Sequence, residues 1–559
     1  MKFINSKIYT GNKDALWADT LVTDGEMVKY CGDKKNCGIE DPETYDMKGR
    51  MIIPGIIDSH THPGMVSQSS WHIKLPWTDD VDELLTFVKD YAEKHPKEEE
   101  PFLYFEYYPT SMFGDKGPTK ELLDKAVSDR PAMCQDFGEH LHWYNSKMLE
   151  MMEVTKDTPD PVPGLEMFVR DENGEPTGWG RELVHLKFAE KLFANIEWEP
   201  PVEMTPKLMM PFFEFLSEHG ICAMADGIVE GEAQMKAMSK LDRQNKLHVY
   251  YDGIVRFWSR EDLPGKIEEL RKYQKLYTGK HIKINTLKLF LDGTNESGNS
   301  AMLSPHLNDP TGTNYGEIKM EKDELADCFL LCNREGLDVH IHMVGDRAFR
   351  TGCDAVEKAK KMAAEEGTPW TMEVIFAHCE IIDPADMKRP AKLGITIDWS
   401  CHWSGGYFGE EGMLFFPEEK WRRMYQFNPI IDSGALVTFS SDVVTFYELH
   451  RADPFFSMQV AATRVDPEFP LDPKKYPGSV RPPESAKLSL ENLFEGYTIN
   501  GAKQMHMEDK LGSLESGKIA NFNIISADPF KTEKNKIKDI GFDAVFFEGK
   551  LIHGKIPQK

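Results

Sequence analysis

Short apolar runs alternate with longer amphipathic segments through the middle of the chain. Eight of these runs have the length of β-strands, and they are Ile52–Ile57, Ile221–Met224, Leu247–Ile254, Thr286–Leu291, Leu337–Val344, Glu373–Ala377, Gly394–Trp399 and Ala435–Ser440. The segments between them have helical patterns; Asp323–Glu335, for example, is amphipathic and is followed by Gly336, a typical helix C-cap. Repeated strand–helix units of this number predict an α/β fold, a (β/α)8 TIM barrel, whose active site lies at the C-terminal strand ends.

Both ends of the chain have strand patterns without helices between them. The N-terminal runs are Lys2–Tyr9, Leu21–Cys31 and Met51–Ile53, and the C-terminal runs are Ala520–Ile525 and Ala544–His553. We therefore expect the two ends to meet in one small β domain. The predicted organisation places residues 1–54 and 496–559 in this domain and residues 55–495 in the barrel.

A long segment, residues about 71–208, separates the first two predicted barrel strands. It is far longer than a usual loop. Its start, Asp79–Glu100, is acidic and helical, and Asp157–Gly180 is rich in proline and glycine. This segment is predicted to be an inserted subdomain.

Composition and charge exclude some functions. The 559 residues are 40% hydrophobic and 28% charged, as in a globular protein, and the net charge of −26 leaves no basic stripe for nucleic acid. No apolar window approaches the ~18 residues of a membrane span. The N-terminus lacks the apolar core of a signal peptide, and the nine cysteines show no regular spacing. We expect a cytoplasmic protein with a small-molecule substrate.

Histidines stand at the ends of several predicted strands. His60 and His62 follow the apolar run Ile52–Ile57, and alternation along a strand places both imidazoles on one face. Asp58, two residues before His60, can orient an imidazole. His342 and His378 end two later runs in the same way. Any one of these histidines alone is more often structural than metal-bound, but their common position at strand ends predicts a site for zinc or a similar divalent ion. His340 shares a face with His342, and we expect it to be hydrogen-bonded core or to support the ligands.

Two further strand residues can complete such a site. Asp442 ends the run at Ala435–Ser440 and can ligate a metal and move protons, although an N-cap is the ordinary use of Asp. Lys288 stands between apolar residues of a predicted buried strand, where a charged amine is costly. A neutral lysine can capture carbon dioxide as a carbamate. A pair with Asp292 or an exposed edge strand are the alternatives, and the residues alone leave them comparable.

The sequence motifs resemble those of the amidohydrolase superfamily and, within it, the amidohydrolase-3 group, which includes YtcJ-like proteins and N-substituted formamide deformylase. The matching segments span almost the whole chain in consistent order: Ile53–His62, His140–Ser146, Gly174–Gly178, Lys288–Gly293, His342–Ala348, the run ending in His378, Ser440–Asp442 and Leu511–Lys518. Two departures are Asn521, where the group usually has Asp, and Tyr107–Asp115, which lacks the usual Gly-Trp-Asp pattern.

The resemblance implies a distorted barrel, a β-sandwich made from both termini, and one or two divalent ions, commonly zinc. It assigns six ligands: His60, His62, Lys288 as a carboxylated bridge, His342, His378 and Asp442. It also implies that His140 lies in the substrate pocket and that the protein is often a homodimer.

The predicted activity is hydrolysis of a C–N bond in an amide or formamide-like substrate. A divalent ion lowers the pKa of bound water from about 15.7 toward ~7 and so supplies hydroxide. We expect Asp442 to shuttle the proton and His140 to steady the oxyanion. The further substrate-binding candidates are Trp143, for which core packing is the simpler interpretation, Asp292 and Arg464. A metal-dependent decarboxylase, which would need an arginine beside the metal such as Arg464, Arg347 or Arg181, and a non-catalytic scaffold are the alternatives.

Overall fold

Eight parallel strands form the central sheet of the computed structural model, which describes residues 1–200, 202–307, 309, 311–406, 412–468, 474 and 480–557. In spatial order they are β21 (Val437–Ser440), β20 (Ile395–Ser400), β19 (Val374–His378), β18 (Asp338–Met343), β17 (Ile282–Phe290), β16 (Tyr250–Arg256), β15 (Ile221–Asp226) and β8 (Ile56–Thr61). Just beyond β21, the backbone N–H of Asp442 donates to His60 O at 2.8 Å, and that of His62 donates to Val443 O at 3.3 Å. These bonds bring the first and last strands together, so the predicted barrel is confirmed.

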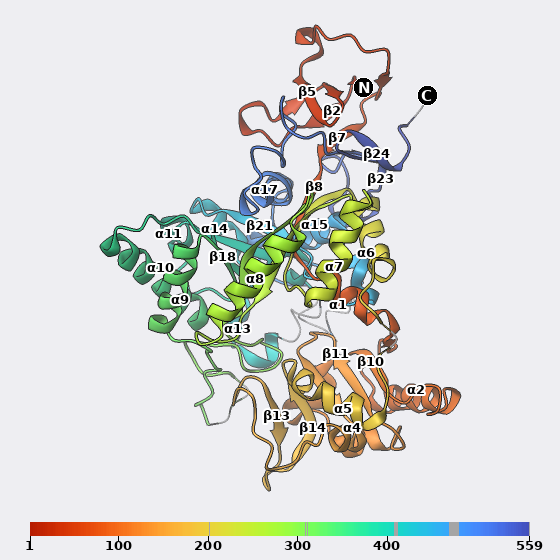
Figure 1. Ribbon diagram of the computed structural model, residues 1–559, viewed down its shortest axis with the longest axis vertical. Helices are drawn as coiled ribbons and strands as arrows, with labels where there is room; N and C mark the ends of the chain where they lie inside the picture. The colour runs from red at the N-terminus through yellow and green to blue at the C-terminus, as the bar shows by residue number, and fades with distance from the viewer. Residues whose placement is uncertain are drawn as a thin grey trace.

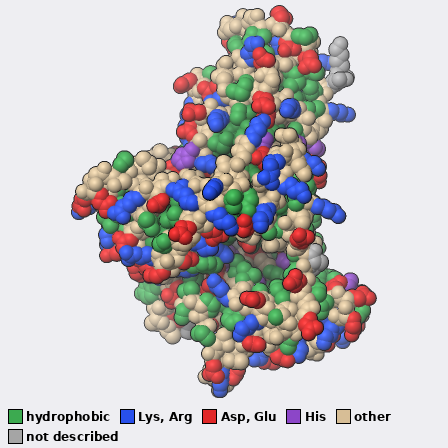
Figure 2. Space-filling view, viewed as in Figure 1, with side chains coloured by type: hydrophobic (Ala, Val, Ile, Leu, Met, Phe, Trp, Pro, Cys, Tyr) green, Lys and Arg blue, Asp and Glu red, His purple; other side chains and the backbone are tan. Residues whose placement is uncertain are grey.

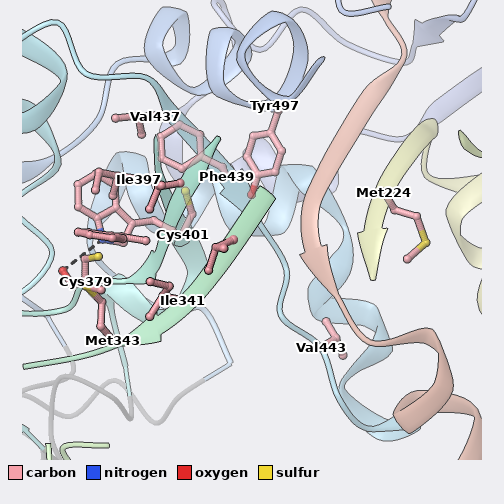
Figure 3. Close-up of a cluster of buried hydrophobic side chains, with 14 of the residues drawn as sticks. Met224, Ile341, Met343, Cys379, Ile397, Cys401, Val437, Phe439, Val443 and Tyr497 are labelled. Atoms are coloured by element: carbon pink, nitrogen blue, oxygen red, sulfur yellow. Dashed lines mark hydrogen bonds between the residues drawn. The ribbon is translucent and has the colours of Figure 1, made fainter. Parts of the chain in front are cut away.

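Helices between the strands cover the outside of the barrel (Figure 1). They include α6 (Pro206–Glu218), α7 (Glu232–Arg243), α8 (Leu263–Tyr277), α9 (Lys322–Glu335), α10 (Asp346–Glu366) and α15 (Pro454–Thr463). As predicted, α9 ends at Gly336, whose φ of 65° is the left-handed conformation that glycine adopts at low cost. Apolar side chains fill the layer between strands and helices; Phe439 of β21 and Tyr497, for example, are 5.5 Å apart between ring centroids (Figure 3).

The first predicted barrel strand is in fact two strands. β7 (Met51–Pro54) belongs to a terminal sheet, and only β8 belongs to the barrel. Gly55 separates them. A Cβ at Gly55 would lie 2.5 Å from Cys222 Sγ and 3.1 Å from Asn521 Cβ, so the chain can pass between these two residues only without a side chain. The interpretation of Ile52–Ile57 as one strand was therefore wrong.

Both ends of the chain contribute strands to the same sheet. Its six strands are β24 (Lys550–Gly554), β23 (Phe542–Phe547), β22 (Phe522–Ile525), β7, β2 (Lys7–Tyr9) and β3 (Trp17–Ala18). A four-stranded sheet of β5 (Met27–Gly32), β4 (Thr20–Asp24), β1 (Lys2–Ile4) and β6 (Thr44–Asp46) lies beside it. Phe3 of the smaller sheet packs against Phe522 and Phe546 of the larger one, with ring centroids 5.3 and 5.7 Å apart. The N-terminal and C-terminal segments therefore share a hydrophobic core.

The segment between β8 and β15 folds around a sheet of its own, at the end of the barrel opposite the termini (Figure 1). Its six strands are β13 (Met167–Arg170), β14 (Pro176–Arg181), β12 (Leu141–Tyr144), β11 (Ala132–Asp136), β10 (Leu103–Tyr108) and β9 (Ile73–Lys74). The expected helix in its acidic start is α2 (Val81–Lys94), whose N-cap Asp80 accepts from two backbone amides. Among the described residues, no helix is long and apolar enough to cross a membrane.

Asp58 joins the two strands at which the barrel closes. Its carboxylate accepts hydrogen bonds from the Ser441 backbone N–H at 3.0 Å and the Ser441 hydroxyl at 2.6 Å. The His60 backbone N–H lies 3.4 Å from the same carboxylate. Sequence reasoning suggested that Asp58 orients an imidazole, but its observed bonds are to backbone and hydroxyl groups. Asp58 thus fixes the relative position of the strand ends that bear His60 and Asp442.

We expect Asp58→Ala to lower stability by about 1–3 kcal/mol, because it leaves buried donors of Ser441 and His60 without an acceptor. The midpoint of thermal unfolding measures this loss. Asp24→Ala is the matched control, because Asp24 is exposed at the end of β4 and substitutions there are expected to cost less than about 0.5 kcal/mol. Equal midpoints for the two variants would contradict the role assigned to Asp58.

Candidate active site

The C-terminal ends of the barrel strands surround a small buried cavity of about 70 Å³. All six predicted ligands line it: His60, His62, Lys288, His342, His378 and Asp442. They come from five places along the chain, on or directly after β8, β17, β18, β19 and β21, with His60 and His62 both from β8 and its end. The structure therefore brings together every residue that the sequence proposed as a ligand.

His60, His62 and Asp442 form the tightest group. Asp442 Oδ1 lies 3.0 Å from His62 Nε2 and 3.5 Å from His60 Nε2, and Asp442 Oδ2 lies 3.5 Å from His378 Nδ1. The three groups of His60, His62 and Asp442 are close enough to bind one ion. Asp442 is not the N-cap of the following helix, which begins after Thr445.

Lys288 lies deeper, between two imidazoles. Its Nζ is 3.2 Å from His60 Nε2 and 3.2 Å from His340 Nδ1. On the other side, Asp398 Oδ2 lies 3.6 Å from His60 Nδ1 and 3.7 Å from His340 Nε2. His60, His340 and Asp398 form a second group whose ligand atoms lie close enough together to bind one ion. His60 therefore stands between the two groups.

His342 and His378 complete the wall of the cavity. Their ring centroids are 4.5 Å apart, and His378 stacks on Trp403 at 5.2 Å. The backbone of His378 has φ 73° and that of Asp442 has φ 46°. Left-handed conformations are costly for residues with a side chain and are concentrated at functional sites.

Gly227, just after β15, gives the imidazoles room. A Cβ at this position would lie 2.4 Å from His60 Nε2 and 2.6 Å from His62 Cε1. Any side chain would therefore displace both rings. The absence of one allows the backbone to pack directly over the histidine pair.

Three of the imidazoles favour the neutral form. Burial lowers the pKa of His60, His342 and His378 well below the ordinary histidine value, and neighbouring cationic groups lower it further. Burial also lowers the pKa of Lys288 to about 8, although Asp442 and Asp398 oppose this shift. Neutral imidazole is the form that binds metals, and a neutral amine is the form that reacts with carbon dioxide.

The donor atoms around the cavity fit a metal ion. Six buried atoms of the cavity wall and of the neighbouring His340 and Asp398 have no hydrogen-bond partner among the described residues: Nδ1 of His60, His62 and His378, Nε2 of His340 and His342, and Oδ2 of Asp398. Buried polar groups are nearly always paired, so such a concentration of unpaired nitrogen atoms requires an explanation. Nitrogen and carboxylate donors are the ligands that zinc and similar ions bind.

His140 of the insertion faces the same cavity. Its Nδ1 lies 2.6 Å from Glu182 Oε2, and its ring centroid lies 5.7 Å from that of His342. Burial lowers the pKa of His140, but the charge and hydrogen bond of Glu182, together with the charges of Glu296 and Asp136, outweigh burial and raise it to about 9. A protonated His140 can therefore donate from Nε2 to an oxygen in the cavity.

Three predicted substrate-binding residues lie outside the lining of this cavity. Trp143 is packed in the core of the insertion, where its indole N–H donates to Thr119 O at 2.8 Å. Asp292 accepts from the backbone amides of Ala301, Val344 and Gly345, and no bond to Lys288 is present among the described residues. Arg464 donates to backbone carbonyls near Tyr425 and Arg481. All three residues therefore bond to backbone atoms, and none of them reaches the reaction cavity.

Sequence reasoning missed Asp398, which lies beside His60 and His340. It also missed three glutamates that line the cavity: Glu139, Glu296 and Glu380. The signal for Asp398 was present. In β20, Thr396, Asp398 and Ser400 alternate with apolar residues, so these polar side chains share the inner face of the barrel. The glutamates follow strands or lie in irregular segments, where no periodicity marks them.

The fold and the cavity together define a β/α barrel with a histidine- and carboxylate-rich mouth. The sequence profile of the amidohydrolase family matches residues 43–553, and the chain belongs to this family. It is 27% identical to exoenzymes regulatory protein AepA of Pectobacterium carotovorum, over 78% of this chain and 92% of that one. It is 21% identical to N-substituted formamide deformylase of Arthrobacter pascens, over 99% and 98% of the two chains. The structure of a metal-dependent hydrolase from Pyrococcus furiosus is similar, with a TM-score of 0.63 and 25% identity over 95% of this chain and 99% of that one. The predicted family is therefore confirmed.

Proposed function

We propose that the protein is a metal-dependent hydrolase that cleaves a C–N bond in an amide or formamide-like substrate. The observation that carries this proposal is the convergence of six ligand-type side chains on one cavity, with one ring nitrogen of each of the four histidines unpaired among the described residues. Membership of the amidohydrolase family and the names of two similar proteins, a formamide deformylase and a metal-dependent hydrolase, support it. The acyl carbon gains the hydroxyl of water, and the nitrogen leaves with the proton.

The site would hold one or two divalent ions, and the nitrogen and carboxylate donors favour zinc. The ligands would be His60, His62, His342, His378 and Asp442. Lys288 would be N6-carboxylated and act as a bridging ligand. A bound ion of this kind polarises a carbonyl oxygen and lowers the pKa of water. The position of Lys288 supports the bridge, because its amine is buried and lies 3.2 Å from His60 Nε2. Its pKa of about 8 leaves part of the amine neutral at physiological pH.

Asp442 and His140 are the proton-handling and orienting groups in this proposal. Asp442 would take a proton from the attacking water and deliver it to the leaving nitrogen, since its carboxylate faces the cavity from the barrel side. His140, held by Glu182, would donate to the oxygen of the substrate carbonyl as charge develops on it.

A larger cavity of about 950 Å³ adjoins the reaction cavity. The two share Met65, Leu183 and Val444 as lining residues. Aromatic side chains of the insertion form much of the wall of the larger cavity: Trp71, Phe102, Tyr104, Phe193 and Trp198. We propose that this cavity receives the non-reacting part of the substrate, with the insertion forming its roof.

We also propose the domain limits predicted from the sequence: a terminal β-sandwich from residues 1–54 and 496–559, and a barrel over residues 55–495 with an insertion over about 71–208. The terminal sheets and the separate insertion sheet support this division. We further propose that the protein is cytoplasmic and that it forms a homodimer.

A panel of amides and carboxylic acids tests the reaction type. We expect amine release from N-substituted formamides and acetamides and no carbon dioxide release from matched carboxylic acids. The assay measures primary amine and carbon dioxide in the same samples, with heat-denatured protein as the control. Carbon dioxide release without amine would favour the decarboxylase, and neither product from metal-loaded protein would favour the non-catalytic scaffold.

A further inference from the structure

Three cationic side chains surround one indole ring beside the reaction cavity. Lys187 Nζ lies 4.0 Å from the centroid of Trp258, Arg256 Cζ lies 3.9 Å from it, and Lys319 Nζ lies 4.5 Å from it. Arg256 is the last residue of β16, Lys187 comes from the insertion, and Lys319 lies between β17 and α9. We call Lys187, Arg256, Lys319 and Trp258 the cation cluster.

The cation cluster brings like charges together without direct partners. Among the described residues, none of the three cationic side chains makes a hydrogen bond, and no carboxylate oxygen lies within 4.0 Å of their nitrogens. Attraction to an indole ring stabilises a cation by only about 0.5–2 kcal/mol, and it does not satisfy N–H donors. The donors of this cluster therefore remain available to a ligand.

Several carboxylates lie near the cation cluster but do not bond to its N–H donors. Glu166, Glu182 and Asp292 line the same small space as the cluster, but Glu182 binds His140 and Asp292 binds backbone amides. Glu166 and Glu230 act on Arg256, and Glu166 and Glu182 act on Lys319, at longer range than an ion pair. The charges of the cluster are therefore opposed at a distance, while its N–H donors have no direct partner among the described residues.

The position of the cluster connects it to catalysis. Arg256 lines the large cavity, and Arg256, Trp258 and Lys319 line a small space that shares Leu183 and Phe290 with the reaction cavity. Arg256 also lies opposite Lys288 in the strand register. Figure 2 shows a recess between the insertion and the barrel in a surface that otherwise mixes acidic and basic groups. Three cationic side chains without direct partners among the described residues therefore stand beside the reaction cavity of a protein whose net charge is −26.

We propose that the cation cluster binds a carboxylate on the non-reacting part of the substrate, so that the preferred substrates are amides that also carry a negative charge. This inference rests on the proposed hydrolysis of a C–N bond and specifies the substrate class. Arg256 supplies a planar fork that matches a carboxylate, and the two lysines add charge without fixed geometry. The indole of Trp258 holds the cations in place in the absence of substrate.

Two substrates that differ only in this charge test the proposal: N-formylphenylalanine and N-formylphenethylamine. We expect kcat/KM to be higher for the first, and Arg256→Gln and Lys319→Gln to lower its kcat/KM by about 10- to 100-fold. In both variants the ratio of kcat/KM for the charged amide to kcat/KM for the neutral amide should fall, because the neutral amide offers the cluster no carboxylate. Lys275→Gln, at an exposed lysine of α8, is the matched control.

A binding measurement separates failure of this inference from failure of the proposed reaction. Calorimetry compares hydrocinnamate with hydrocinnamyl alcohol, which lacks the charge. Tighter binding of hydrocinnamate that is lost in Lys319→Gln would support carboxylate binding by the cation cluster, whether or not the amides are hydrolysed. Failure to hydrolyse either amide would contradict only the proposed function. Equal binding of the two ligands, or equal kcat/KM for the two amides in the unmodified protein, overturns the inference.

Discussion

Asp442→Asn is expected to lower kcat by about 10²- to 10⁴-fold while the protein keeps its metal. The amide that replaces the carboxylate still offers an oxygen near His60 and His62, from which Asp442 Oδ1 is 3.5 and 3.0 Å away. It cannot accept a proton from water, so the proton transfer to the leaving nitrogen loses its carrier. The substitution thus separates the proposed role of Asp442 as a ligand from its proposed role as a base.

The measurement combines kcat on an N-substituted formamide with metal content by atomic emission. Asp24→Asn, at an exposed aspartate of β4, is the control for the loss of a carboxylate in general. Full turnover with full metal content would show that Asp442 is not the base. Loss of metal together with turnover would assign Asp442 only as a ligand.

Removal of the metal is expected to abolish turnover and to lower the temperature of unfolding. The metal-free cavity leaves at least six buried donor or acceptor atoms unpaired, so the folded state loses the partner that satisfies them. A ligand present at about 100 times its Kd stabilises the folded state by about 2.7 kcal/mol. Chelation should remove both this stabilisation and the activity, and added zinc should restore them.

Differential scanning calorimetry of chelated and zinc-loaded protein measures this effect. His60→Gln should abolish the rise in unfolding temperature caused by zinc, because His60 belongs to both groups of side chains that could bind an ion. His450→Gln is the control, because His450 is exposed and does not line the reaction cavity. An unfolding temperature that is unchanged by chelation, with activity retained, would refute a metal-dependent site.

The residues that sequence reasoning could place are those on regular strands. The apolar alternation of β18 puts His340 and His342 on one face, and the strand-end position of His60, His378 and Asp442 follows from the repeated strand–helix pattern. Such patterns specify which face a side chain occupies and at which end of the barrel it lies. Together with the family resemblance, they were sufficient to predict the barrel and the candidate ligands that line one cavity.

Other features depend on contacts between distant segments, which no local pattern reports. The break at Gly55 exists because Cys222 and Asn521 approach the backbone there. The cation cluster joins the insertion, the end of β16 and the loop after β17, so no sequence spacing relates Lys187 to Lys319. Asp58 was assigned to an imidazole because the sequence cannot show that Ser441 lies beside it.

The pairing of β7 with β22 has a consequence for synthesis of the protein. β7 (Met51–Pro54) leads through Gly55 directly into the strand that bears His60, yet its neighbour on one side is β22 (Phe522–Ile525). During translation this edge of β7 stays without its partner until nearly the whole chain has left the ribosome. Truncation before residue 522 would leave the same edge open, and its exposed backbone would be able to pair with another molecule.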